Sequence, residues 1–483
     1  MEQKKITYKE KFRPQYHVTH DTGWLNDPNG MVYYEGKWHL FYQLEHRTKY
    51  AGHDKWWGHA VSSDLANWEI LPIALSPDEY GSIWSGSAVV DENNSSGLFS
   101  DTPQKQGLVA FYTSASHEHQ RQCMAYSKDS GSSWIKYNGG APIIDIDADP
   151  LKCYDFRDPK VFWHTESEQW MMVIAGGPLR FYSSNDLINW KPEGMQNEIH
   201  MECPDFYPLK TNTEQSEQKW ILSGCGVWYM TGDFNKIDGV WKFVPDTGER
   251  IEFNAGADVY AAQTFSNSYN DRVIKVDWMT HIGYAGERGI QDVTDPWCHV
   301  LTLPYELGLI KCGNKYFITQ SPVKELSVLR EKSYEWQNEI ITSDSDNLLK
   351  DLSLDKYELQ ITADVSESNG FGLRLRKSGN EYTEINYKTS VNTLTLDRTK
   401  SGTIPFERFS SAFTTKVVPE SGKINLHIFV DWSSIEMFAQ NGKTVFTNLI
   451  FPDAKSFGLE IFANNGKVKI ESLKIYELKS IWE

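Results

Sequence analysis

A phrase that recurs about every sixty residues constrains the fold of this 483-residue chain more than any other feature. Ser and Asp followed by Trp occur as "SSDLANW" at 62–68, "SKDSGSSW" at 127–134 and "SNDLINW" at 184–190. Ser and Asp favour tight turns because their side chains hydrogen-bond nearby backbone amides. Each phrase therefore predicts the tip of a hairpin between two strands.

Five apolar runs belong to the same repeat. They are "WHLFYQ" at 38–43, "GLVAFYTS" at 107–114, "WMMVIAG" at 170–176, "WILSGCG" at 220–226 and "RVIKVDW" at 272–278. Each unit has room for about four short strands, and radial repetition of four-stranded sheets is typical of a β-propeller. The sequence predicts a five-bladed β-propeller over residues 1–320.

The last third of the chain follows another pattern. Segments such as "KINLHIFVDWSSIEMF" alternate apolar and polar residues, and Asn-Gly pairs at 441–442 and 465–466 are typical of tight hairpin turns. This predicts a β-sandwich over residues 337–483, joined to the propeller by a linker with a short helix at 321–336. The expected fold class is all-β.

Charge and composition narrow the partners. The formal net charge of −17 disfavours nucleic acid and anionic membrane surfaces, which are bound through excess Lys and Arg. The chain has no apolar leader or membrane-spanning run, so we expect a cytoplasmic protein unless a signal was removed. Its six cysteines form no C-x-x-C pair, and the histidines of "HEH" at 117–119 lack ligand spacing, so we predict neither disulfides nor a metal site. A homo-oligomer stays open.

Acidic residues open the first strand of several units. The five openings are Asn26-Asp27-Pro28 in "GWLNDPNG", Trp84-Ser85-Gly86, Arg157-Asp158-Pro159, Glu202-Cys203-Pro204-Asp205 and Ala262-Gln263-Thr264. The innermost strands of a propeller line its axis, so equivalent openings meet at one mouth. We therefore expect the carboxylates of Asp27, Asp158 and Glu202 to share one space.

Asp before Pro is also common turn chemistry, and a single Asp-Pro is more often structural than catalytic. Acids at equivalent positions of three units are harder to explain by turns, which accept Asn, Ser or Gly as well. Crowded carboxylates repel, and crowding raises the pKa of at least one of them. An ionised acid beside a protonated acid is the pair that glycoside cleavage requires.

The chain resembles glycoside hydrolase family 32, the β-fructofuranosidases, which include invertases, levanases and inulinases. The motifs that carry the resemblance, nearly end to end, are "WLNDPNG" at 24–30, "FYQ" at 41–43, "WGHAVSSDLANWEILPIAL" at 57–75, "WSGSAVV" at 84–90, "FRDPKV" at 156–161, "ECPDFY" at 202–207, "YAAQTF" at 260–265 and "LTLPYEL" at 301–307. One departure follows "FYQ", where many relatives continue with "YNP". The loop on the leaving-group side therefore differs here.

The resemblance implies a propeller carrying a sandwich, and it implies a role for each acid. Asp27 would be the nucleophile, Glu202 the general acid and then base, and Asp158 the stabiliser that binds fructose hydroxyls. The residues expected to bind the sugar are Asn26, Gln43, Trp84, Ser85, Arg157 and Trp278. No metal or organic cofactor is implied.

We therefore expect a retaining exo-β-fructosidase that acts on sucrose or fructans. Three alternatives stay open: a hydrolase of sucrose 6-phosphate, a related propeller glycosidase acting on arabinosides, and a non-catalytic fructan-binding protein. An inverting enzyme would hold its two carboxyl groups farther apart to admit a water, and a binding protein would keep the aromatic residues without the acids. The sandwich is expected to buttress the propeller, although it could also bind polysaccharide.

Overall fold

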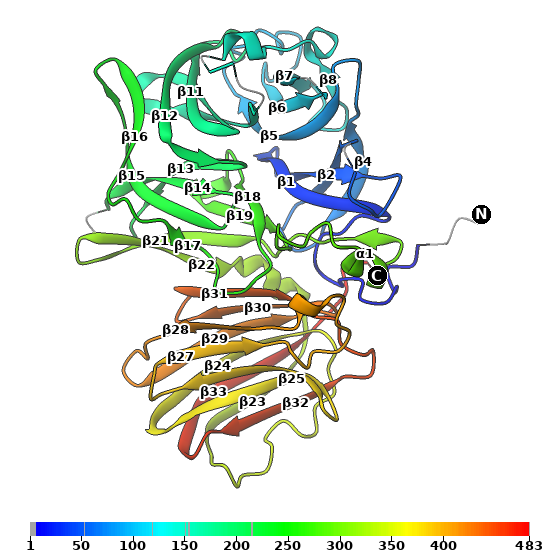
Figure 1. Ribbon diagram of the computed structural model, residues 1–483, viewed down its shortest axis with the longest axis vertical. Coiled ribbons are helices and arrows are strands. Elements are labelled where there is room, and N and C mark those ends of the chain that lie inside the picture. Colours follow the sequence, from blue (N-terminus) through cyan, green and yellow to red (C-terminus); the bar gives the residue numbers. More distant parts are fainter. Residues whose placement is uncertain are drawn as a thin grey trace.

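The computed structural model describes residues 6–52, 54–117, 119–149, 151–152, 155–213 and 216–482. The described chain forms two stacked bodies, drawn one above the other in Figure 1. Strands dominate both, and the one α-helix of the described ranges is α1 (Arg288–Val293). No helix within these ranges has the length and apolar character needed to cross a membrane.

The upper body consists of five sheets that follow one another along the chain. Blade 1 comprises β1 (Gly23–Tyr34), β2 (Lys37–Glu45), β3 (Trp56–Ser62) and β4 (Glu69–Leu75), with β20 (Trp297–Cys298) parallel to β1. Blade 2 comprises β5 (Ser82–Asp91), β6 (Gly107–Ala115), β7 (Gln120–Ser127) and β8 (Ile135–Lys136). Blade 3 comprises β9 (Arg157–His164), β10 (Gln169–Ala175), β11 (Gly177–Ser184) and β12 (Lys191–Met201). Blade 4 comprises β13 (Pro204–Lys210), β14 (Gln218–Gly224), β15 (Trp228–Ile237), β16 (Val240–Pro245) and β17 (Ile251–Glu252). Blade 5 comprises β18 (Tyr260–Thr264), β19 (Val273–Trp278), β21 (Tyr305–Cys312) and β22 (Lys315–Pro322).

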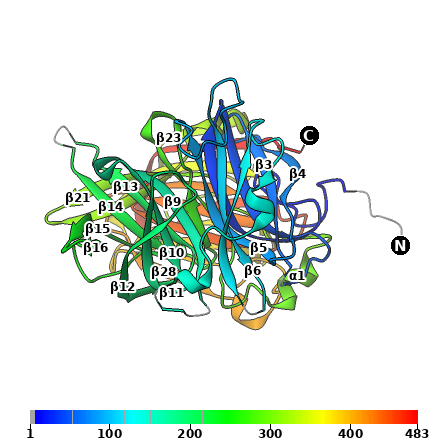
Figure 2. The same cartoon turned by 90° about the horizontal axis from the view of Figure 1, so that it is seen from above.

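The first strands of the five blades close a ring. β1 contacts β5, β5 contacts β9, β9 contacts β13, β13 contacts β18, and β18 returns to β1. Figure 2 shows β9 between β5 and β13. The strands around the axis are therefore the first strands, and the all-β fold with a propeller is confirmed. The five apolar runs of the sequence are the second strands, β2, β6, β10, β14 and β19.

Aromatic and aliphatic side chains fill the space between neighbouring blades. Between blades 1 and 2, for example, Phe41 and Trp57 pack with Ile83 and Leu108, and all four are buried. Similar clusters separate the following pairs of blades. The second strand of each blade is covered by a neighbouring blade on both of its faces. It therefore appears in the sequence as a continuous apolar run rather than as an alternating pattern.

The Ser-Asp-Trp phrases form turns between outer strands, as predicted. In blade 1 the Asp64 carboxylate accepts hydrogen bonds from the backbone amides of Ala66 and Asn67, and the Trp68 indole donates to the Leu65 carbonyl at 3.1 Å. Blade 3 repeats the arrangement around Asp186. The phrase therefore joins the third and fourth strands of a blade.

The lower body is a sandwich of two sheets. One sheet has the order β23 (Arg330–Ile341), β33 (Gly466–Leu478), β24 (Tyr357–Ser368), β29 (Lys423–Val430), β30 (Ser434–Ala439) and β31 (Thr444–Leu449). The other has the order β28 (Ala412–Lys416), β27 (Thr393–Asp397), β26 (Glu381–Lys388), β25 (Gly370–Ser378) and β32 (Gly458–Ala463). The Asn-Gly turn at 441–442 joins the paired strands β30 and β31, and the one at 465–466 lies between β32 and β33. All four residues have positive φ, the conformation that favours Asn and Gly.

The segment 321–336 differs from the expected linker. It contains a 3-10 helix at Lys324–Leu329, but β23 begins directly after it and pairs with β33 of the sandwich. The residues of β23 are mostly exposed because this strand lies at the edge of its sheet. An edge strand exposed on both sides lacks the alternating pattern by which the other strands of the sandwich were recognised.

A buried histidine connects the N-terminal segment to the sandwich. His17 Nδ1 lies 2.7 Å from Asp431 Oδ2, and its Nε2 lies 2.8 Å from Glu436 Oε1. Burial opposes protonation, yet the hydrogen bonds to these two carboxylates raise the pKa of His17 to about 9. Glu436 also accepts hydrogen bonds from the Leu303 amide and the Tyr305 hydroxyl of the propeller. The protonated imidazole thus neutralises charge where the two domains meet.

We expect His17→Ala to lower the free energy of unfolding by about 3–5 kcal/mol, because it leaves two buried carboxylates without their cation. In the parent, the contribution of His17 is fully present below the pKa of a free histidine and is lost as pH rises through about 9. Denaturant unfolding between pH 6 and 10 measures both effects. His281→Ala, which removes an exposed histidine, is the control. If the free energy of unfolding depends on pH equally in the parent and in His17→Ala, the raised pKa of His17 is contradicted.

Candidate active site

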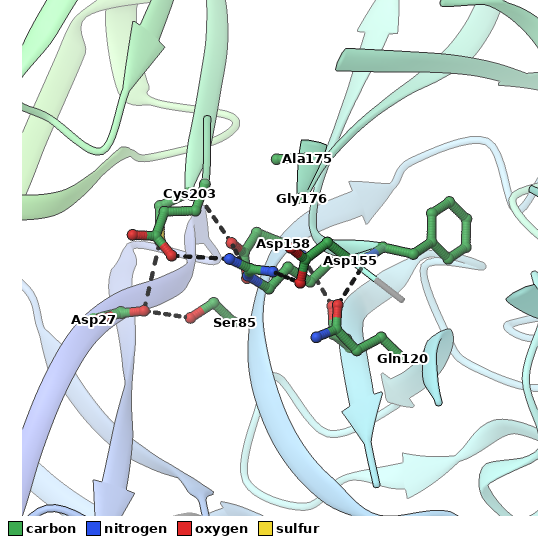
Figure 3. A network of polar contacts seen from close by, with 12 residues as sticks. Asp27, Ser85, Gln120, Asp155, Asp158, Ala175, Gly176 and Cys203 are labelled. Atoms are coloured by element: carbon green, nitrogen blue, oxygen red, sulfur yellow. Dashed lines mark hydrogen bonds and ion pairs between the residues drawn. The ribbon is translucent and has the colours of Figure 1, made fainter. Parts of the chain in front are cut away.

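Three acids from three blades meet at one mouth of the propeller. Asp27 lies in β1, Asp158 is the second residue of β9, and Glu202 lies two residues before β13. Figure 3 shows Ser85 in contact with Asp27, and Cys203 in contact with both Asp27 and Asp158. The register of the repeat therefore places these acids together, as their positions at the strand openings predicted.

The Asp27 carboxylate accepts three contacts from neighbouring side chains. Ser85 Oγ of blade 2 donates to Oδ2 at 2.7 Å, and Asn26 Nδ2 donates to Oδ1 at 3.0 Å. The Cys203 thiol of blade 4 lies 3.6 Å from Oδ2. Donors on both oxygens hold the carboxylate in one orientation while one edge of it remains open to the cavity.

Asp158 is buried, with 3% of its surface exposed, and its backbone has φ of 61°. The Cys203 amide donates to its Oδ2 at 2.8 Å, and its own amide donates to Thr113 Oγ1 at 2.9 Å. Burial raises the pKa of Asp158 to about 6, although the charge of Arg157 and the Cys203 amide oppose the shift. Ionisation of Asp158 therefore costs free energy in the folded protein.

We expect Asp158→Asn to stabilise the fold and to lower activity. The folded state holds the Asp158 proton more tightly than the unfolded chain does, so stability falls as pH rises from about 4 through about 6. The amide removes this cost, roughly 2–3 kcal/mol at neutral pH, and its Oδ1 can still accept from the Cys203 amide. Turnover should fall by about a hundredfold or more, since the buried charge is lost.

Thermal unfolding at pH 5 and pH 7, with turnover measured on the same samples, tests this prediction. Asp238→Asn is the control, because Asp238 is exposed and lies outside the cavity. If Asp158→Asn is less stable than the parent at pH 7, the ionised Asp158 carboxylate stabilises the fold and the prediction is wrong.

Glu202 is held by two partners and remains 36% exposed toward the cavity. Arg157 Nη2 donates to its Oε2 at 3.0 Å, and the Tyr260 hydroxyl donates to its Oε1. Arg157 also lies 3.7 Å from Asp158 Oδ2 through its Nε. One guanidinium therefore connects two of the three acids.

A cavity of about 190 Å³ opens between these acids. Its lining residues are Asn26, Asp27, Gln43, Gly52, Lys55, Trp84, Ser85, Arg157, Asp158, Glu202 and Cys203. Eight of the nine residues predicted for the site belong to this lining. The ninth, Trp278, lies behind the wall, where its ring packs edge-to-face against Trp24 at 6.0 Å and Tyr260 at 6.5 Å.

The lining offers polar atoms without protein partners. Among the described residues, the buried Asn26 Oδ1 accepts no hydrogen bond, so it can accept from a ligand hydroxyl. No group of three or more His, Cys, Asp or Glu in the described ranges is arranged to hold a metal ion.

Lys55 is a site residue that the sequence did not reveal. Its side chain is buried, and its ammonium lies 5.6 Å from the centre of the Trp24 ring. The ammonium makes no hydrogen bond or ion pair with the described residues, whereas the Lys55 backbone amide donates to Ser82 Oγ at 3.4 Å. Burial lowers the pKa of Lys55 to about 8, although the charges of Asp27 and Glu45 oppose the shift. Lys55 and Gly52 lie where the chain departs from the family pattern after "FYQ", and that departure was the available signal.

Tyr260 was also missed, because the opening of blade 5 was placed at Ala262. The structure begins β18 at Tyr260, two residues earlier, and this is the position that faces Glu202. A β-bulge between Tyr260 and Gln263 accounts for the difference, since a bulge shifts the side chains that follow it to the other face.

Comparison with known proteins extends the match over nearly the whole chain. The model of the glycosyl hydrolases family 32 N-terminal domain matches residues 17–322, and the family 32 C-terminal model matches residues 325–477. The chain belongs to glycoside hydrolase family 32. The resemblance carried by the sequence motifs is thereby confirmed, and the three acids belong to a glycoside hydrolase.

Relatives of this family 32 protein include a levanase from Bacillus subtilis, which is 40% identical over 98% of this chain and 72% of the relative. A fructan β-fructosidase from Streptococcus mutans is 39% identical over 99% of this chain but only 34% of the relative, so this chain spans about a third of that protein. Among solved structures, the exo-inulinase of Aspergillus awamori superposes with a TM-score of 0.87 at 28% identity, covering 99% of this chain and 100% of that one. The β-fructofuranosidase of Schwanniomyces occidentalis in complex with fructosyl-erythritol has a TM-score of 0.84 at 26% identity, covering the same shares of the two chains.

Proposed function

We propose that this family 32 protein is an exo-acting β-fructosidase that hydrolyses terminal β-D-fructofuranoside linkages in sucrose and fructans with retention of configuration. The observation that carries the proposal is the convergence of Asp27, Asp158 and Glu202 around one small cavity. The names of the relatives, which include levanase, fructan β-fructosidase and exo-inulinase, support the substrate class.

In the first step Asp27 attacks the anomeric carbon of the fructosyl unit. The bond from that carbon to the leaving oxygen breaks, and the oxygen takes a proton from Glu202. Ser85 and Asn26 orient the attacking carboxylate through their hydrogen bonds, and the Tyr260 hydroxyl and the Arg157 guanidinium fix the acid. A fructosyl ester on Asp27 results.

In the second step a water molecule gives a proton to Glu202 and attacks the same carbon, which releases Asp27. Asp158 lies beside both residues in the same cavity and, together with Asn26 Oδ1, offers acceptors to the sugar hydroxyls. These contacts orient the ring while positive charge develops on it.

The dimensions of the cavity favour exo action. With about 190 Å³ it admits one sugar ring rather than an internal segment of a polymer. Buried packing of Trp57 against the backbone of Trp84, whose carbonyl accepts from the Trp57 indole at 3.0 Å, makes the wall rigid. Only the terminal fructosyl unit of a chain can then reach Asp27.

Sucrose 6-phosphate is a second candidate substrate, and Lys55 is the observation that favours it. The sequence offered no cluster of basic residues, yet the structure places in the cavity lining an ammonium that has no ion-pair partner among the described residues. An ammonium can donate to a sugar hydroxyl as well as to a phosphate, and the three carboxylates nearby disfavour a dianion. Sucrose and fructans therefore remain the first candidates.

Chromatography of the products formed from sucrose, sucrose 6-phosphate, inulin and levan tests the proposal. Fructose should be the first product from each true substrate, because an exo-acting enzyme removes terminal units one at a time. Short oligosaccharides as the first products from levan or inulin would contradict exo action. If no substrate yields fructose, arabinosides become the next substrates to test, followed by binding without turnover.

A further inference from the structure

A second cavity, larger than the first, lies away from the three acids. It has a volume of about 440 Å³, and we refer to it as the distal cavity. Its aromatic and polar lining includes Glu92, Asn93, Ser95, Trp163, Trp170 and Asn185. None of these residues contributes to the proposed chemistry.

The distal cavity lies at the opposite end of the propeller axis. On β9, Asp158 lines the first cavity and Trp163 lines the distal cavity, five residues further along the same strand. An extended strand rises about 3.3 Å per residue, so about 16 Å separates them. β5 and β13 follow the same course, with the segments at their openings lining the first cavity and later residues lining the second.

Buried groups close the axis between the two cavities. Lys160 Nζ lies 2.8 Å from Asp205 Oδ1 and donates to the Thr264 carbonyl at 3.0 Å. Both charged side chains are almost completely buried. The distal cavity is therefore a separate compartment, and the lysine in its floor is already neutralised by a carboxylate.

Trp163 gives the distal cavity the character of a sugar site. Its side chain is 45% exposed, and it is the one tryptophan of the described ranges that reaches this degree of exposure. Its ring packs edge-to-face against Trp170 at 5.3 Å, and the Trp170 indole donates to Ser95 Oγ at 3.0 Å. Trp170 is therefore held in place and supports the exposed ring, whose face can stack on a pyranose or furanose ring.

Polar groups beside Trp163 are free to bind hydroxyls. The side chains of Glu92 and Asn93 are exposed and make no hydrogen bond or ion pair with residues that the structure describes. The only charge they offer is negative, and the whole chain carries −17, so a polyanion is disfavoured. An exposed indole with amide and carboxylate neighbours suits a neutral carbohydrate.

We propose that the distal cavity is a second, non-catalytic binding site for fructan chains. The choice of ligand rests on the proposed function, because the polymer that feeds the catalytic cavity is the carbohydrate most often near the enzyme. A fructan segment held there raises the local concentration of chain ends at the other mouth. Sucrose, which is soluble and small, gains nothing from such retention.

Affinity electrophoresis in gels containing levan, inulin or dextran, combined with kinetics on levan and sucrose, tests the proposal. Trp163→Ala should lose most of its retardation in fructan gels and show about a fivefold higher KM for levan, with kcat/KM for sucrose unchanged. Trp163→Phe, which keeps an aromatic face, should retain most of the effect. Tyr269→Ala removes an exposed aromatic residue that does not line the cavity and is the matched control.

The proposal would be overturned if Trp163→Ala bound and degraded levan like the parent. It would also be overturned if Trp163→Ala lost as much retardation in dextran gels as in fructan gels. Asn93→Ala serves as the second variant if Trp163→Ala lowers the thermal midpoint, because Asn93 is exposed and has no partner among the described residues. Sucrose hydrolysis tests the proposed function separately from the second binding site. If the parent releases fructose from sucrose while retardation is unaffected by both variants, the second site fails and the proposed function stands.

Discussion

Asp27→Asn is expected to release fructose from sucrose at least a thousandfold more slowly than the parent, with the fold intact. The amide has the volume of the carboxylate and can still accept the Ser85 hydroxyl, so packing and position are preserved. It has no charge with which to attack the anomeric carbon, and no fructosyl ester forms. Because one ester must form in every turnover, no other residue compensates.

Rates measured by chromatography of released fructose, with thermal unfolding as the fold control, test this expectation. Asp101→Asn is the matched variant, since the Asp101 side chain is 70% exposed and lies outside the cavity. It should hydrolyse sucrose like the parent. A rate for Asp27→Asn within tenfold of the parent would remove Asp27 from the role of nucleophile.

Glu202→Ala is expected to lower sucrose turnover by about 10²–10⁴-fold, the usual contribution of a general acid and base. Glu249→Ala, which removes an exposed glutamate, is the control. Tyr260→Phe should cause a smaller loss, since the acid remains but loses one of its two partners.

Azide distinguishes the roles of the two acids by the configuration of the product. In Glu202→Ala the ester on Asp27 still forms, so azide should replace water and yield the β-fructosyl azide, with configuration retained. In Asp27→Ala azide occupies the space of the carboxylate and should yield the α-fructosyl azide, with configuration inverted. The opposite assignment of products would exchange the two roles, and no acceleration by azide in either variant would argue against the double-displacement mechanism.

Local patterns were sufficient to predict much of the fold. The Ser-Asp-Trp phrases specify turns through hydrogen bonds within a few residues, as around Asp64, and their spacing reports the length of a blade. The five apolar runs indicate the second strands of the blades, which are covered on both faces. The boundary near 330 was less visible, because β23 is an exposed edge strand with little apolar patterning.

The candidate site was predictable where a residue's chemistry is unusual for its position. Acids that open several inner strands are not demanded by turn preference, so Asp27, Asp158 and Glu202 stood out. Tyr260 did not, because a bulge in β18 changes which residue faces Glu202. Lys55 did not, because it lies between β2 and β3 in the segment that departs from the family pattern after "FYQ", and no motif there marks a lysine that lines the cavity.

The sequence by itself determined the repeat, the strands and the identities of the acids, because these depend on interactions between residues close in the chain. Only the tertiary structure decided that Arg157 bridges Asp158 and Glu202, that Trp278 lies behind the wall, and that burial raises the pKa of Asp158. Distances between blades and the exclusion of water arise when the ring closes. They depend on residues from different blades, such as Arg157 and Glu202, whose contacts no local pattern records.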